Sequence, residues 1–228
     1  IVGTPAILEL TEALASLRER SDVRALVLRG SGDKAFIGGA DIYEMSTLTP
    51  PDAEAFITRL KNLCEAVRSF PAPTIARLSG WTLGGGLEVA LACDLRISST
   101  DGRYGMPEVA AGIPSVIHAV LLPRLIGSSR ATWMLMTGET IDGATAHQWG
   151  LVHELCDPVE LDTRIANLAG KLAGYGPAAL RQQKAMLRSW ESLTPDEAIE
   201  SSVAEFGRAF STGEPQHYME LFKRRRRG

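Results

Sequence analysis

The chain has 228 residues, of which 45% are hydrophobic and 22% charged, and its formal net charge is −3. This length can bury a core without disulfides, and the slightly acidic balance offers no electrostatic footprint for nucleic acid. The three cysteines, Cys64, Cys93 and Cys156, are scattered without metal-site spacing, so we expect reduced thiols, no metal and a cytoplasmic protein. No apolar stretch reaches the length of a membrane span, so no membrane partner is expected.

Helix and strand signals alternate over the first two-thirds of the chain. Helical periodicity marks residues 4–20, 51–69 and 85–94, and strand patterns mark residues 23–30, 73–80 and 95–100. We expect the first helix to have Thr4 as its N-cap and Pro5 at its first position. The alternation predicts an α/β fold with crossover connections.

From Asp142 onward the pattern becomes mostly helical. A short helix ending at Gly150 precedes a short strand, and three longer helices are then predicted over residues 158–176, 177–190 and 194–210. Because these helices lack strand partners, their apolar faces must pack on the core or on another subunit, and we expect the second for at least one of them. The predicted division is therefore a core at 1–157 and a helical region at 158–228. The run "KRRRR", residues 223–227, indicates a solvated tail, with contact to phosphates as the alternative.

Two bare glycine turns run directly into helices: "GGADI", residues 38–42, and "GGGLE", residues 84–88. Glycine lets the backbone approach a ligand closely, and a helix start offers unpaired N–H groups to an anion. Two such turns can hold one oxygen from two sides.

Two glutamates accompany these turns. Glu88 lies one turn into the second helix, where we expect its carboxylate near the N–H groups of Gly85 and Gly86, and Glu108 follows 20 residues later. Two facing carboxyl groups near such donors make an acid/base pair, one protonated and one ionised. The alternative is structural, with Glu88 stabilising the helix dipole and Glu108 pairing with an arginine. The spacing alone leaves both interpretations open.

A series of motifs, in family order, resembles the crotonase superfamily, best known for enoyl-CoA hydratases and isomerases. "AFIGGADIYEM" resembles the family's F-x-x-G-A-D-[IL] turn, and "GWTLGGGLEVALACDLRISS" resembles its G-x-x-x-G-G-G-x-E-x-A-x-x-C-D turn and helix. "YGMPEVAAGIP" resembles the F-G-x-P-E-x-x-x-G segment, and the stretch beginning "LPRLIGSS" resembles the part that follows. The resemblance covers nearly the whole chain.

The resemblance implies a spiral of β-β-α units followed by helices for oligomerisation, in a homotrimer or a dimer of trimers. The family's first strand and its R-P-x-x-x-N-A turn have no counterpart before Ile1. We therefore expect the CoA cleft to lack one wall, which bears on affinity more than on reaction type.

The resemblance also implies roles for four residues. Ala40 and Gly85 match the two positions whose N–H groups form the oxyanion hole, and Glu88 and Glu108 match the two glutamates of the hydratase subgroup. The implied reaction adds water across the C2=C3 bond of a trans-2-enoyl-CoA, with Glu88 taking the proton of the water that attacks C3 and Glu108 protonating C2. CoA is then part of the substrate and no separate cofactor is expected. The alternatives are an enoyl-CoA isomerase, a CoA-ester hydrolase or decarboxylase, and a non-catalytic scaffold.

Further residues are expected at the substrate and CoA site. The acyl thioester is expected to contact the glycine turns and their surroundings, at Gly38, Gly39, Gly84, Asp41, Ile42 and Met45. Asp41 is expected to serve chiefly as a helix cap, and Lys34 is the candidate for the CoA phosphates. "SVIHAVLLPRL", residues 115–125, stands where many hydratases have a glycine-rich continuation. We expect Ser115 and His118 on one helix beside the acyl pocket, with His118 either touching substrate or packing in the core.

Overall fold

The computed structural model describes residues 1–225, and its strands form two four-stranded sheets. The first sheet has the order β1-β3-β5-β8, and all its neighbours are parallel: β1 is Leu26–Arg29, β3 Thr74–Leu78, β5 Leu95–Ser99 and β8 Glu154–Cys156. The second has the order β2-β4-β6-β7: β2 is Ala35–Ile37, β4 Trp81–Leu83, β6 Arg103–Gly105 and β7 Thr140–Asp142. Here β2, β4 and β6 are parallel and β7 runs antiparallel to β6.

The chain alternates between the two sheets, placing β1, β3 and β5 in the first and β2, β4 and β6 in the second. Each pair is followed by helical structure: α3 (Pro50–Arg68), α4 (Gly85–Ala92) and the 3₁₀ helix η1 (Pro107–Ala111). This is the expected spiral of β-β-α units, so the predicted fold class is confirmed. The corner between β3 and β4 needs Gly80, because its φ is +56° and a β-carbon there would collide with the Lys34 carbonyl oxygen.

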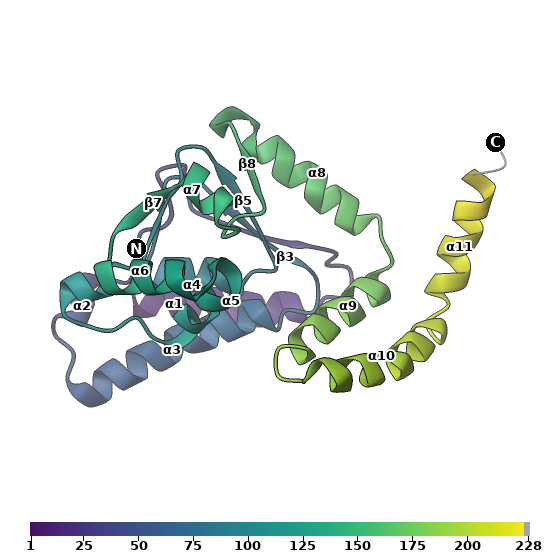
Figure 1. The fold of residues 1–228 in the computed structure, drawn as a ribbon, viewed down its shortest axis with the longest axis horizontal. Coiled ribbons are helices and arrows are strands. Elements are labelled where there is room, and N and C mark those ends of the chain that lie inside the picture. The colour runs from purple at the N-terminus through teal and green to yellow at the C-terminus, as the bar shows by residue number, and fades with distance from the viewer. Residues whose placement is uncertain (226–228) are drawn as a thin grey trace.

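The core lies between the sheets and the helices that follow them. Strand β3 is buried along its whole length, as expected for a parallel strand covered on both faces. Helix α3 buries an apolar stripe, and α1 (Thr4–Arg18) packs along it (Figure 1). Every residue of α4 is buried, which takes the carboxyl group of Glu88 into the interior with it.

Shorter elements complete the main body. They are α2 (Ile42–Met45), the 3₁₀ helix η2 (Ile117–Leu121), α5 (Leu122–Ile126), α6 (Ser128–Thr137), α7 (Gly143–Gln148) and the 3₁₀ helix η3 (Pro158–Glu160). The helix start predicted at Thr4 is displaced by one residue, because Gly3 is the N-cap and Thr4 is already helical. Thr4 instead donates its hydroxyl and its N–H to the carboxylate of Glu44 on α2.

The C-terminal helices divide into two groups. Helix α8 (Leu161–Ala173) packs on the first sheet, where Leu161 and Ile165 join Ile75 and Ile97 in a second apolar cluster. Helix α9 (Pro177–Ser189) contacts the core through the buried Lys184, whereas α10 (Pro195–Phe210) and α11 (Glu214–Arg225) extend away from the sheets (Figure 1). The last residues of the basic run, beyond position 225, lie outside the described part of the chain.

The structure can be compared with the expectations for the cysteines, for a membrane-spanning helix and for a metal site. All three cysteines are buried and unpaired. Within residues 1–225, no helix is both long enough and apolar enough to cross a bilayer. The same residues contain no group of three or more His, Cys, Asp or Glu side chains placed to hold a metal ion.

Candidate active site

A cleft of about 320 Å³ lies where the turn after β2, the start of α4 and the helix η1 meet. It is lined by Ile1, Gly38, Gly39, Ala40, Asp41, Ile42, Tyr43, Met45, Leu83, Gly84, Gly85, Pro107, Glu108, Ala111 and Ile113. The structure therefore brings both glycine turns and Glu108 to one place. Asp41 also caps α2, accepting from the N–H groups of Tyr43 at 2.9 Å and Glu44 at 3.3 Å, which confirms its expected structural role.

The backbones of Ala40 and Gly85 both line this cleft. Val2 donates to the carbonyl of Gly39 at 2.9 Å and accepts from the N–H of Asp41 at 3.1 Å. This parallel bridge uses the groups on either side of Ala40, so the N–H of Ala40 points to the opposite side of the strand. Gly85 is the first residue of α4, where an N–H has no acceptor within the helix. Within the described residues, neither the bridge to Val2 nor helix α4 uses these two N–H groups, so each glycine turn can offer one donor.

The Glu108 carboxyl group faces the cleft from η1. Its Oε2 accepts a hydrogen bond of 2.8 Å from the hydroxyl of Ser115, and its Oε1 lies against the backbone of Gly84. The sequence reasoning missed this role of Ser115. It also placed Ser115 and His118 on one helix, whereas η2 begins at Ile117, after Ser115.

The Glu88 carboxyl group lies behind the cleft and is only 3% exposed. Its Oε1 accepts from the N–H of Ala119 on η2 at 3.0 Å, and its Oε2 lies 4.0 Å from the point at which a β-carbon would stand on Gly85. The pKa of Glu88 is raised to about 8, chiefly by burial and to a smaller extent by the nearby charge of Glu108, while the N–H groups of Ala119 and His118 oppose the shift. A carboxyl group in this state exchanges protons near neutral pH.

Two predicted contact residues lie outside the cleft lining. His118 is 5% exposed, and its Nε2 lies 3.0 Å from Oε1 of Glu65 on α3. Burial lowers the pKa of His118, and Glu65 opposes that shift. Lys34 is exposed in the turn before β2 and lines a different groove, of about 760 Å³, between α1 and the strands β1 and β2. Neither glutamate of the pair lines that groove, so its size does not make it the site of the chemistry.

The arrangement combines three chemical capacities at one cleft. Fixed N–H donors can polarise a carbonyl oxygen, a buried carboxyl group can hold a proton at neutral pH, and a second carboxyl group faces the same space. Buried acids with raised pKa values beside a second titratable group are typical of catalytic sites.

Comparison with known proteins agrees with this arrangement. The sequence profile of the family described as "Enoyl-CoA hydratase/isomerase" matches residues 4–227. The chain is 32% identical over 222 residues to the crotonyl-CoA hydratase of Syntrophomonas wolfei subsp. wolfei, covering 97% of this chain and 85% of that protein. It is 30% identical over 227 residues to the short-chain-enoyl-CoA hydratase of Clostridium acetobutylicum, covering 99% and 87%. The crystal structure of an enoyl-CoA hydratase from Bacillus anthracis matches with a TM-score of 0.95 at 28% identity, covering 98% of this chain and 87% of that one.

Proposed function

Because the chain belongs to the enoyl-CoA hydratase/isomerase family, we propose that it is a hydro-lyase that adds water across the C2=C3 bond of a trans-2-enoyl-CoA. One observation carries the proposal: Glu108 lines the cleft beside Ala40 and Gly85, and Glu88 lies behind it, near enough that the charge of Glu108 raises its pKa. An isomerase needs one group to move a proton between carbons, whereas hydration needs a base for water and an acid for C2. The pair supplies both.

The two N–H groups act on the thioester carbonyl. When they bind its oxygen, electrons are drawn from the double bond and C3 becomes electrophilic. After water attacks, the same donors stabilise the enolate oxygen. Donors of this kind are effective because the fold fixes them in advance, and losing one typically raises the barrier by about 3 kcal/mol.

Hydration needs one carboxyl group of the pair ionised, to act as the base, and the other protonated, to act as the acid. In the hydration step the oxygen of water bonds to C3 and its proton passes to the ionised carboxylate, while the protonated carboxyl group delivers its proton to C2. The sequence assignment makes Glu88 the base. The raised pKa of Glu88 favours its protonated form in the unliganded site, so Glu88 must lose that proton before it acts as the base. The atoms balance without any cofactor beyond CoA itself.

The cleft also fits the rest of the substrate. Ile42, Met45, Leu83 and Ile113 give it an apolar wall suited to an acyl chain or the pantetheine arm. Lys34 is the cation that we assign to the CoA phosphates. It lies in the turn that precedes β2, and β2 leads directly into the first glycine turn.

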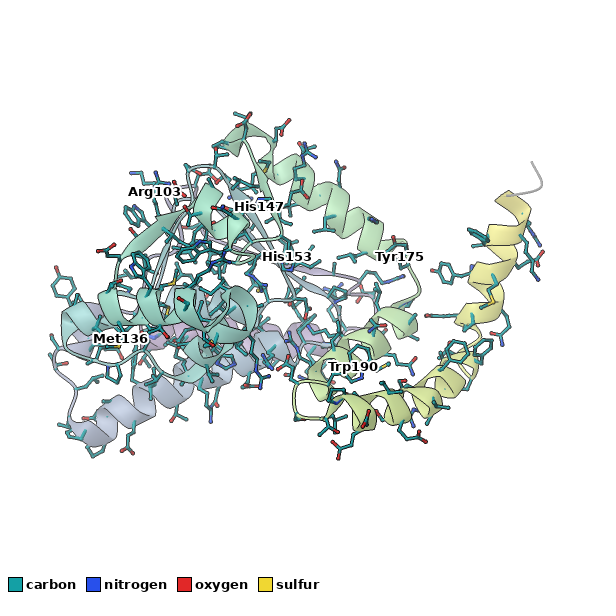
Figure 2. All side chains as sticks on the ribbon, viewed as in Figure 1. Arg103, Met136, His147, His153, Tyr175 and Trp190 are labelled. Carbon is teal, nitrogen blue, oxygen red and sulfur yellow. The ribbon has the colours of Figure 1, made fainter. Side chains whose placement is uncertain are left out.

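The C-terminal helices support assembly with further copies of the chain, as a homotrimer or a dimer of trimers. Apolar side chains on α10 are exposed, including Ile199, Val203 and Phe206 at 66% to 70%. Between α9 and α10 runs an apolar groove that reaches Trp190, which Figure 2 shows near the turn between the two helices. Exposed apolar area on this scale is typical of subunit contacts. Sedimentation velocity measures the state directly, and a monomer at micromolar concentration would contradict the assignment.

The hydratase proposal is tested by following loss of the enoyl-thioester absorbance of crotonyl-CoA. We expect turnover by the wild type and losses of several orders of magnitude for Glu88→Gln and Glu108→Gln. Glu54→Gln, a matched change on an exposed part of α3, should keep full activity. If the wild type binds acyl-CoA but leaves crotonyl-CoA and longer trans-2-enoyl-CoAs untouched, the hydratase proposal fails. A 3-enoyl-CoA then tests the isomerase alternative.

A further inference from the structure

Ile117 has a backbone conformation that its side chain disfavours. Its φ is +38°, and it is the one non-glycine residue with positive φ among residues 1–225. A β-branched side chain in the left-handed region is strained, and such strain persists only where the surrounding structure imposes it. Ile117 is the first residue of η2.

The residue after Ile117 is anchored to a different element. The His118 side chain is 6% exposed, and its Nε2 lies 3.0 Å from Oε1 of Glu65 on α3. Its Nδ1 is buried and has no hydrogen-bond partner in the described residues. Protonating Nδ1 would bury an unpaired N–H, so the neutral form with its proton on Nε2 is favoured, donating to Glu65.

The anchored turn carries the donor that binds Glu88. The N–H of Ala119 is shared between Oε1 of Glu88 at 3.0 Å and the carbonyl of Val116 at 2.9 Å. The N–H of His118 also favours the ionised form of Glu88. The strained residue, the anchored side chain and the donors are therefore consecutive, at positions 117, 118 and 119.

We propose that His118 is a positioning residue: its hydrogen bond to Glu65 holds the strained turn at Ile117 so that the N–H groups of His118 and Ala119 stay on the Glu88 carboxylate. The inference rests on the proposed function in so far as Glu88 belongs to the catalytic pair. It differs from the substrate contact considered from the sequence, because His118 acts from behind Glu88. A glycine at position 117 would adopt the φ of +38° without strain. A glycine at position 118 would have no side chain to donate to Glu65.

The charged groups around the two side chains are few. Glu88 faces Glu108 on η1 and the buried thiol of Cys64 on α3. His118 faces Glu65 and Arg68 on α3, and Arg188 on α9. Arg68 and Arg188 both pair with Glu191, which the proposed variants leave in place.

The test measures the Glu88 carboxyl directly, by ¹³C NMR titration of glutamate δ-carbons in the full chain, with the signal assigned through Glu88→Gln. His118→Leu keeps much of the volume and removes the donor, whereas His118→Gln keeps an Nε2 donor for Glu65. Glu65→Ala removes the acceptor from a partly exposed position, so it tests the same hydrogen bond without disturbing the core. Glu54→Ala is the matched change on the exposed face of α3.

We expect the pKa of Glu88 to rise by about one unit in His118→Leu and Glu65→Ala, because the carboxylate loses well-placed donors. His118→Gln should return it most of the way to the wild-type value, and Glu54→Ala should not move it. Titrations that are identical in all variants would overturn the proposal, as would an equal shift in Glu54→Ala.

Kinetics with crotonyl-CoA give a second readout. In His118→Leu and Glu65→Ala we expect kcat to fall about tenfold with KM nearly constant, and the acidic limb of the kcat/KM profile to move to higher pH. A raised KM with an unmoved limb would mean that His118 touches substrate, and would overturn the positioning role. If the wild type hydrates no enoyl-CoA, the proposed function fails, while the NMR titration still decides whether His118 positions Glu88.

Discussion

The Oε1 atom of Glu108 lies 2.5 Å from the point at which a β-carbon would stand on Gly84. Gly84 has φ +51° and ψ −126°, a combination open essentially to glycine alone. The bare α-carbon therefore does two things at once. It lets the chain turn from β4 into α4, and it leaves room for the carboxyl group that faces the cleft.

Replacing Gly84 by alanine should push the Glu108 carboxyl group away from the backbone of residue 84. We expect Gly84→Ala to lower the free energy of unfolding by about 2–4 kcal/mol, from backbone strain and contact with Glu108. The kcat/KM for crotonyl-CoA should fall at least about a hundredfold, because a shift of roughly 1 Å in a catalytic group is that costly. Urea denaturation and the absorbance assay measure the two effects.

Gly32→Ala is the control for this change. Gly32 also lies in a turn, but a β-carbon there meets no heavy atom within 4 Å, and its φ is outside the left-handed region. Stability and activity should stay within about 0.5 kcal/mol and twofold of the wild type. An active, fully stable Gly84→Ala enzyme would show that the position of Glu108 against Gly84 is not needed.

Ala40, Gly85 and Glu108 were assigned through the family motifs that they match, and the structure brings these three residues to one cleft. The hydrogen bond from the N–H of Ala119 to the Glu88 carboxylate did not follow from the sequence, because the two residues are 31 positions apart. Contacts between distant segments depend on how η2 packs over α4, which local pattern does not encode.

Glu88 should make stability depend on pH. Its pKa in the folded protein is about 8, against 4.5 for the free group, so between these values the folded state binds more protons than the unfolded state. The wild type therefore loses stability as pH rises through this window. Glu88→Gln removes the titration and can still accept from Ala119. It should become more stable than the wild type by a few kcal/mol above pH 8, with about 5 kcal/mol as the upper limit.

Urea denaturation of the two proteins at pH 5, 7 and 9 measures this difference. The gap should be small at pH 5, grow through pH 7 and level off above pH 8. Glu54→Gln, on the exposed face of α3, should run parallel to the wild type at all three values. A difference between Glu88→Gln and the wild type that does not change with pH would mean that Glu88 is not desolvated as the fold indicates.

Asp94 joins the core to the C-terminal helices. Its carboxylate accepts from Lys184 at 2.7 Å and Arg188 at 2.9 Å, both on α9, and from the backbone of Thr74 at 2.8 Å. Burial lowers the pKa of Lys184, and Asp94 opposes that shift. Helix periodicity predicts α9, but not that a lysine on it is the buried contact.

Asp94→Asn should release α9 from the core. Because it leaves Lys184 buried without a counter-charge, we expect a loss of about 3 kcal/mol in unfolding free energy. Hydrogen exchange should show faster opening of α9 than of β3. Asp22→Asn, which breaks an exposed pair with Arg20, should leave the unfolding midpoint unchanged. Equal effects of the two changes would contradict the anchoring role of Asp94.

Lys34 should contribute to binding and not to chemistry, because it is exposed in the turn before β2 and lies outside the catalytic cleft. We expect Lys34→Ala to raise KM for crotonyl-CoA up to about fivefold with kcat unchanged, as fits one exposed charge pair. The effect should shrink in 0.5 M salt, which screens such a pair. Crotonyl-pantetheine, which lacks the phosphates, should show no difference between variant and wild type. Lys61→Ala on the exposed face of α3 is the matched control. A KM effect that persists with crotonyl-pantetheine would place Lys34 against the acyl or pantetheine portion instead.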